Sequence, residues 1–270
     1  MTALAQSTPA TDPDVLLRRD QDGVAILTLN RPAQRNALSA ALMSALQGAL
    51  DRLHDDRSVK VVVIEGAGPA FCSGHDLKEL RANPTRQAYE AVFAQCSRLM
   101  MTITRLPKPV IAKVHGVATA AGCQLVATCD LAVAARSARF ATPGVNIGLF
   151  CSTPMVALSR AVGRKPAMEM LLTGDLIDAE TARSFGLVNR VVDDAELDRA
   201  TLALAGQIAS KSPLTLAIGK EAFYKQAELG LEQAYAYASE VMTRNMLARD
   251  AELGIDAFIN KQPQPKWQGC

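Results

Sequence analysis

Two segments rich in small residues carry backbone groups that could bind and polarise a carbonyl oxygen. Residues 69–80 and residues 115–125 each follow an apolar run and lead into a helical pattern. The first residues of a helix leave N–H groups without internal acceptors, next to the positive end of the helix dipole. Two such segments side by side could direct two N–H groups at one oxygen, as an oxyanion hole. Spacing alone favours a plainer alternative, in which the small residues only allow close packing.

The strands and helices expected around these two segments indicate an α/β protein. Apolar, β-branched runs predict strands at residues 24–29, 59–64, 110–114 and 131–134. Helical patterns alternate with them at residues 38–53, 88–103 and 122–129. Ser39 is the expected N-cap of the first helix, whose leucines share one face. Short strands alternating with longer helices indicate an α/β fold.

The C-terminal part of the chain has a different pattern. Strand signals become few after residue 193, and Pro213 is expected to begin one of several helices. We therefore divide the chain into a disordered tail at residues 1–14, a core at residues 15–200 and a helical region at residues 201–265.

The composition excludes several classes of function. Hydrophobic residues make up 49% of the 270, enough for a substantial core, and charged residues make up 21%. A net charge of +2 gives no general attraction for nucleic acid. The most apolar long window, residues 116–135, is interrupted by Gln124 and Asp130, so no membrane span is expected.

The cysteines and histidines favour neither a metal site nor a disulfide framework. The chain has six cysteines without a C-x-x-C pair and only three histidines, so zinc-type spacing is absent. Residues 1–14 do not have the pattern of a signal peptide. Reduced, mostly buried thiols in a cytoplasmic protein are therefore expected.

Five motifs in order, over roughly residues 15–267, resemble the enoyl-CoA hydratase/isomerase (crotonase) superfamily. In chain order they are Asn30-Arg31-Pro32 with Asn36-Ala37-Leu38; Phe71-Cys72-Ser73-Gly74-His75-Asp76-Leu77; residues 116–125 with Cys129-Asp130; Phe140-Ala141-Thr142-Pro143; and Leu172-Thr173-Gly174. Residues 71–77 and 148–154 also mark a subgroup. The resemblance implies a spiral of ββα units, with a C-terminal helical region that assembles a homotrimer or a hexamer, the latter a dimer of trimers.

The resemblance also implies an acyl-CoA thioester as ligand and no separate cofactor, since coenzyme A is part of the substrate. The N–H groups of His75 and Ala121 are the implied oxyanion-hole donors. Other implied substrate-binding positions are Arg35, Ala37, Cys72, Gly74, Asp76, Leu77, Lys78, Gly122 and Phe258.

For some of these positions the resemblance implies a specific contact with the ligand, and a purely structural or surface role is the alternative. Arg35 and Lys78 are expected near the CoA phosphates, although both types of residue are often simply solvated surface charge. Ala37 and Leu77 are expected along the pantetheine. Phe258 is expected beside the adenine or, alternatively, in the core.

The sequence departs from the family at both catalytic acids. Hydratases of the family use two glutamates, and the corresponding positions here are Gln124 and Gly144. Neither residue exchanges a proton near neutral pH, so hydration by the usual route is not expected. Three functions remain: an enzyme that stabilises a thioester oxyanion or enolate, a catalytically weak acyl-CoA-binding protein, and an acyl-CoA thioester hydrolase.

Other residues near the two segments could replace the missing acids. The His75 imidazole could titrate near neutral pH, although the motif needs only its backbone. Cys151 could act as a nucleophile, but a buried inert thiol is the favoured interpretation. Asp76 and Asp130 stand where the family uses a structural aspartate, so loop capping is favoured over catalysis.

Overall fold

The computed structural model describes residues 15–270, which fold around two β-sheets. The larger sheet has the order β1-β2-β3-β4-β6-β9, and β1 alone is antiparallel to its neighbour. Its strands are β1 (Leu16–Gln21), β2 (Val24–Leu29), β3 (Val61–Gly66), β4 (Val110–Val114), β6 (Leu131–Ala135) and β9 (Arg190–Val192). The smaller sheet consists of β5 (Val117–Thr119), β7 (Arg139–Ala141) and β8 (Ile177–Asp178).

Successive units of the chain contribute one strand to each sheet. β4 and β6 join the larger sheet, whereas β5 and β7, which follow them, pair in parallel in the smaller one. The helix α4 (Ala121–Thr128) follows β5, and a 3-10 turn at Pro143–Ile147 followed by α5 (Ser152–Ala161) comes after β7. The predicted α/β class and spiral of ββα units are therefore confirmed.

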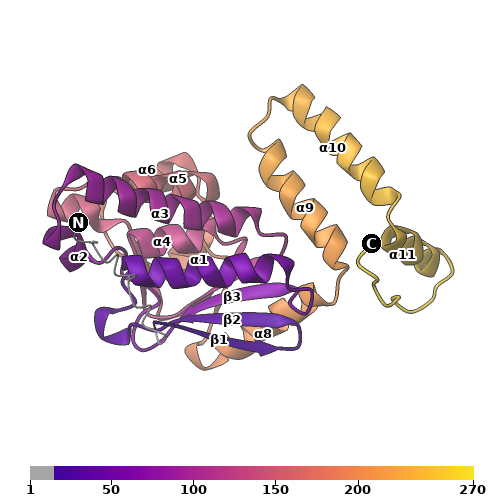
Figure 1. Cartoon of the computed structure of the whole chain (residues 1–270), viewed down its shortest axis with the longest axis horizontal. Helices are drawn as coiled ribbons and strands as arrows, with labels where there is room; N and C mark the ends of the chain where they lie inside the picture. The colour runs from indigo at the N-terminus through magenta and orange to yellow at the C-terminus, as the bar shows by residue number, and fades with distance from the viewer. Residues whose placement is uncertain (1–14) are drawn as a thin grey trace, which may run out of the picture.

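Helices cover both faces of the larger sheet (Figure 1). Val24 and Ile26 of β2 point to the face covered by α8 (Leu197–Ala209). Ala25 and Leu27 point to the main core, because successive side chains of a strand alternate between faces. That core contains the buried faces of α1 (Ala40–Asp55), α3 (Arg86–Arg105) and α4.

Most locally encoded elements lie where the sequence predicts them. The strand predicted at residues 110–114 is β4, and Ser39 caps α1 by accepting a hydrogen bond from the Leu42 N–H at 3.1 Å. The strand predicted at residues 59–64 begins later, at Val61. Val59 instead donates to the Asp56 carbonyl in the preceding turn, and Lys60 donates to the Gly23 carbonyl in the turn between β1 and β2.

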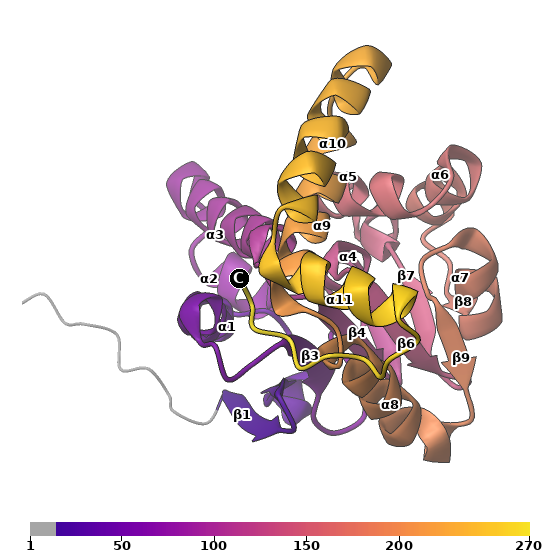
Figure 2. The same cartoon turned by 90° about the vertical axis from the view of Figure 1, so that its right-hand side faces the viewer.

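The C-terminal helices extend away from the two sheets (Figures 1 and 2). They are α9 (Pro213–Gln226), α10 (Leu231–Met246) and α11 (Arg249–Ile259), and Pro213 begins α9 as predicted. The expected boundary after residue 200 falls inside α8, which packs on the sheet, and the division into regions remains a prediction. The expected tail at residues 1–14 lies outside the described residues.

Asp130 connects α9 to the core. Its carboxylate accepts hydrogen bonds from Lys220 Nζ at 2.7 Å, the Tyr224 hydroxyl at 2.9 Å and the Val110 N–H at 2.7 Å. Asp130 therefore has a structural role, as predicted, but its partners lie on β4 and α9 and it does not cap its own loop. The remaining helices are α2 (Leu77–Ala82), α6 (Arg164–Thr173) and α7 (Ala179–Phe185). Within residues 15–270, no helix is both long and apolar enough to span a membrane.

Candidate functional site

The two segments rich in small residues lie side by side. The Cys72 N–H donates to the Val117 carbonyl at 3.1 Å, and the Thr119 N–H donates back to the Cys72 carbonyl at 3.0 Å. The Thr119 hydroxyl adds a bond of 3.1 Å to the Ser73 carbonyl. These bonds join segments more than forty residues apart in the chain and fix the register between them.

Glycine is required where the two backbones approach most closely. A Cβ atom on Gly122 would overlap the carbonyl oxygen of Cys72. A Cβ atom on Gly74, whose φ is +98°, would lie 2.8 Å from Ala120 Cβ and 3.3 Å from Ala121 N. The close-packing interpretation of these small residues is therefore correct, and the same packing brings the end of the first segment against the start of α4.

The backbone N–H groups at this junction that have no acceptor among residues 15–270 include one from each loop. These two belong to His75 and Ala121, whereas their neighbours Asp76 and Ala120 donate to the carbonyls of Leu38 and Ala141. Ala120 precedes α4 with φ 50° and ψ −118°, a conformation that residues other than glycine rarely adopt. Two free donors on adjacent loops, one of them at a helix N-terminus, are the components of an oxyanion hole.

The imidazole of His75 has no hydrogen-bond partner of normal geometry within the described chain. Both ring nitrogens are enclosed, and the ring meets Phe93 of α3 edge-on, with centroids 5.6 Å apart. Burial lowers the pKa of His75, since it penalises the charged ring, and it outweighs the opposite effect of the Leu38 backbone. The ring is therefore neutral at neutral pH, and the sequence-based expectation that it could titrate there is not supported.

Gln124 lies on α4 and is 5% exposed. Its Oε1 is 4.0 Å from the thiol of Cys96, and its Nε2 donates to no group in residues 15–270. Burial raises the pKa of Cys96 to about 12, so this thiol is not a base at neutral pH. This position holds hydrogen-bonding groups but no exchangeable acid.

Gly144 lies in the 3-10 turn after β7 and faces Cys151. A Cβ atom on Gly144 would lie 2.5 Å from the Leu149 carbonyl oxygen and 2.9 Å from Cys151 Sγ. Burial raises the pKa of Cys151, which favours the neutral thiol. Position 144 therefore carries no acid, and a Cβ atom there would overlap its neighbours.

A network from the Asn30-Arg31-Pro32 motif holds the first loop. Arg31 donates to the Ala37 carbonyl at 2.6 Å and to Asp76 Oδ2 at 3.0 Å. Asp76 caps α2 by accepting from the N–H groups of Lys78 and Glu79, as its predicted structural role requires. Burial opposes ionisation of Asp76, but Arg31 and the cap bonds outweigh it and lower its pKa.

Asn36 also holds this loop in place, through hydrogen bonds to the backbone at its start. It is fully buried, and its Nδ2 donates to the carbonyls of Ala67 and Ala70 at 2.8 and 2.7 Å. Neither Asn36 nor Arg31 was assigned a role at the site from the sequence. Their presence in the first motif was the available signal, but the contacts join residues far apart in the chain.

The other predicted substrate-binding residues fall into two groups. Arg35, Leu77 and Lys78 are exposed beside the first loop, and the Arg35 carbonyl accepts the Ser73 N–H at 3.0 Å. Ala37 and Cys72 are buried beneath it, and burial raises the pKa of Cys72 to about 12.

Phe258 is separate from the other predicted residues. It is 85% exposed on α11, at the opposite end of the molecule from α2 (Figure 1). The alternative that Phe258 belongs to the core is therefore wrong, and one copy of the chain does not bring it to the two loops.

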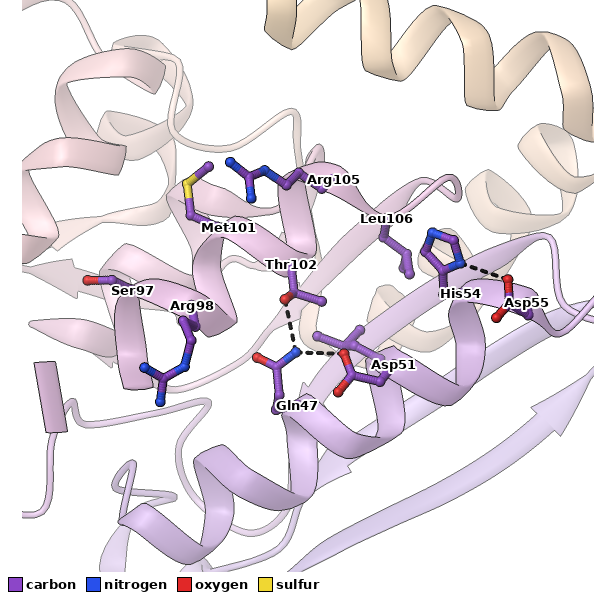
Figure 3. Close-up of a pocket in the computed structure, with 11 residues that line it drawn as sticks. Gln47, Asp51, His54, Asp55, Ser97, Arg98, Met101, Thr102, Arg105 and Leu106 are labelled. Atoms are coloured by element: carbon purple, nitrogen blue, oxygen red, sulfur yellow. Dashed lines mark hydrogen bonds and ion pairs between the residues drawn. The ribbon is translucent and has the colours of Figure 1, made fainter. Parts of the chain in front are cut away.

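A large cavity lies elsewhere, between the C-terminal halves of α1 and α3 (Figure 3). Its volume is about 810 Å³, and its lining includes Gln47, Asp51, Arg98 and Arg105 but no residue of either loop. Gln47 Nε2 donates a hydrogen bond to Asp51 on the same helix and another to Thr102 of α3 across the cavity. This cavity is therefore not the candidate oxyanion site.

No cluster within residues 15–270 has the side chains to hold a metal ion.

Comparison with known proteins identifies the family to which this fold and these paired loops belong. Residues 19–269 match the enoyl-CoA hydratase/isomerase family, and the chain belongs to this family. It is 48% identical over 261 residues to the rat enoyl-CoA hydratase domain-containing protein 3, mitochondrial, covering 96% of this chain and 86% of the rat protein. The subgroup marked by residues 71–77 and 148–154 is therefore that of the domain-containing protein 3.

Solved structures give the same result. The human enoyl-CoA hydratase domain-containing protein 3 has a TM-score of 0.91 and 48% identity, over 93% of this chain and 100% of the human one. An enoyl-CoA hydratase of Mycobacterium smegmatis has a TM-score of 0.91 and 54% identity, over 94% and 98% of the two chains. The resemblance inferred from the motifs, including the crotonase-like fold, is confirmed.

The comparisons correct the predicted location. A cytoplasmic protein was expected from the cysteines and the N-terminal composition. The rat, mouse and human relatives are mitochondrial proteins, so the cytoplasmic expectation is wrong. Reduced thiols fit more than one compartment, which is why cysteine usage could not distinguish them.

Proposed function

We propose that this protein binds an acyl-CoA thioester and holds its carbonyl oxygen between the N–H groups of His75 and Ala121. The observation that carries the proposal is that both donors lack acceptors within the described residues while their loops are bonded to each other. One such donor contributes about 3–4 kcal/mol to an oxyanionic transition state. The site is suited to a thioester oxyanion or an enolate.

The proposed chemistry excludes two-carboxylate hydration. Adding water across a double bond requires a base for the water and an acid for the α-carbon, and each contributes about 10²–10⁴-fold. Gln124 supplies an amide, and a side chain at position 144 would meet the Leu149 carbonyl and the Cys151 thiol. We therefore propose an acyl-CoA-binding family member with weak hydratase activity or none.

The rest of the ligand is proposed to lie along the first loop. Arg35 and Lys78 are exposed and have no ion-pair partner among residues 15–270, so both are free to meet the CoA phosphates. Ala37 and Leu77 would line the pantetheine. Cys72, Gly74, Asp76 and Gly122 shape the two loops rather than contact the reacting atoms.

We further propose that the C-terminal helices assemble a homotrimer or a hexamer. They expose large apolar side chains, including Phe223, Leu231, Tyr235, Met242 and Leu247. Large apolar side chains exposed together on neighbouring helices often mark an interface between proteins. A role for Phe258 at the adenine would require this assembly, because Phe258 lies far from the loops of its own chain (Figure 1).

Calorimetry and a hydration assay test the proposed function on the same samples. We expect butyryl-CoA to bind and crotonyl-CoA to bind without loss of its enoyl-thioester absorbance. Free coenzyme A should bind more weakly, because it lacks the carbonyl. Failure of every acyl-CoA to bind would overturn the oxyanion site, and rapid hydration would overturn the exclusion of that reaction.

A further inference from the structure

The proposed function leaves open the role of the His75 imidazole, a titratable side chain of the first loop. Both Nδ1 and Nε2 are enclosed, and neither has a hydrogen-bond partner of normal geometry in residues 15–270, although the Leu38 backbone lies close enough to raise the pKa of the ring. Leaving a buried polar group unpaired costs about 1–3 kcal/mol, and native structures rarely do so. A group that supplies the missing hydrogen bonds is therefore expected, and a ligand can bring it.

The position of the ring points to the acyl part of the ligand. The N–H of the same residue is a proposed donor to the thioester oxygen, so the first carbons of the acyl chain must pass close to His75. On its other side the ring meets Phe93 of α3, with a centroid distance of 5.6 Å and an interplanar angle of 74°. The imidazole thus packs against Phe93 in the first half of α3, and we call this part of α3, with α2 before it in the chain, the cover.

This cover is loosely attached to the core. No residue from 77 to 95 is buried, and the first buried residue of α3 is Cys96. Phe93 itself is 39% exposed. Segments with little buried apolar surface open at low free-energy cost, so an acyl chain can reach the ring by displacing this cover rather than the core.

The chemistry of a neutral imidazole restricts what can satisfy it. One nitrogen donates a hydrogen bond and the other accepts one. A hydroxyl group does both, a carboxylate can only accept, and an unsubstituted alkyl chain does neither. The ligand that fits the ring best therefore carries a hydroxyl.

We propose that the His75 side chain selects acyl-CoA thioesters that carry a hydroxyl on the first carbons of the acyl chain. This inference rests on the proposed function, because it needs the thioester to be held at the His75 N–H. His75 would thus have two separate roles: its backbone binds the carbonyl common to all thioesters, and its ring distinguishes between acyl groups.

Calorimetry with matched ligands tests the selection. The probes are butyryl-CoA, 2-hydroxybutyryl-CoA and 3-hydroxybutyryl-CoA, with the wild type and His75→Leu. We expect one hydroxyacyl-CoA to bind at least about tenfold more tightly than butyryl-CoA, as one hydrogen bond in a buried site would give. The ratio should fall to about one in His75→Leu.

His54→Gln is the matched control, because His54 is an exposed histidine on α1 outside both loops, and it should keep the preference. Equal affinities in the wild type, or a preference that survives in His75→Leu, would overturn the selection. Butyryl-CoA binding without a preference leaves the proposed function intact, whereas no binding of any probe would overturn both proposals.

A measurement on the wild type avoids dependence on how the variant folds. The ¹⁵N chemical shifts of the His75 ring should change much more with the preferred hydroxyacyl-CoA than with butyryl-CoA, because only the former makes hydrogen bonds to the nitrogens. Identical ring shifts with all three ligands bound would contradict the proposal.

Discussion

The thiol of Cys151 lies where a side chain on residue 144 would have to begin. A Cβ atom on Gly144 would be 2.9 Å from Cys151 Sγ and 2.5 Å from the Leu149 carbonyl oxygen. A side chain at position 144 would therefore overlap its neighbours unless the turn moved. Replacing one residue cannot restore the hydratase arrangement, because backbone as well as side chain occupies that space.

We expect the double variant Gln124→Glu/Gly144→Glu to gain less than about tenfold in crotonyl-CoA hydration. A correctly placed acid and base would each contribute about 10²–10⁴-fold, but a carboxylate introduced at position 144 could enter only by displacing the turn. Gly144→Glu should also lower the free energy of unfolding by about 1–3 kcal/mol, as overpacking does. Absorbance at the enoyl-thioester band and urea unfolding give the two readouts.

Gln124→Glu alone is the control for this variant, since it keeps the side-chain length and leaves the turn unchanged. A rise in hydration of a hundredfold or more in the double variant, without loss of stability, would show that the missing acids were the only deficit. The steric interpretation of Gly144 would then be wrong.

Arg31→Met should weaken both the fold and the site. Arg31 bonds to Asp76 and the Ala37 carbonyl, and the side chains of the ion pair are only 18% and 15% exposed. Breaking such a pair leaves a largely buried carboxylate, so we expect a loss of about 2 kcal/mol at pH 7 and weaker acyl-CoA binding. Arg160→Met, which removes an exposed ion pair with Glu228, should change stability by less than about 0.5 kcal/mol.

The cost of Arg31→Met should depend on pH. The pKa of Asp76 in the folded protein lies below its ordinary value of 3.8, so the unfolded chain takes up the proton first as pH falls. The stabilisation is therefore complete well above pH 4 and is lost as pH falls through the folded-state pKa. Urea unfolding at pH 7 and pH 3 should show the difference between wild type and variant shrinking, and a constant difference would exclude Asp76 as its source.

Asp250→Ala should release the C-terminal end of the chain. Asp250 is 1% exposed and accepts hydrogen bonds from Ser212 Oγ at 2.6 Å and from the N–H groups of Gln268 and Gly269 at 2.7 and 3.0 Å. Its removal leaves three donors without their acceptor, so we expect a loss of about 3 kcal/mol. Hydrogen exchange should become faster at residues 262–270, while Glu252→Ala, on the exposed side of α11, should leave it unchanged.

The six thiols should differ strongly in reactivity. Cys270 is exposed, whereas Cys72, Cys96 and Cys123 are fully buried with pKa values raised to about 12 by burial. Because the thiolate is the reactive form, a disulfide reagent should label one thiol rapidly in the folded protein. Cys270→Ser should remove that rapid phase, and a second rapid thiol in this variant would contradict the described burial.

The sequence predicted the features that depend on neighbouring residues and on ordered motifs. The bounds of β4 and the Ser39 cap follow from local patterns, and the motifs placed His75 and Ala121 on adjacent loops. The contacts of Phe93 with His75 and of Cys151 with Gly144 could not be predicted, because they depend on how separate elements pack. The predicted cytoplasmic location was wrong, since amino-acid composition does not specify the cellular compartment.

The most direct test of the account is the carbonyl stretch of butyryl-CoA labelled with ¹³C at the thioester carbon. Two N–H donors polarise the carbonyl, so infrared difference spectra should show a lower wavenumber for bound than for free ligand. A bound carbonyl with the stretch of the free thioester would contradict the oxyanion hole at His75 and Ala121.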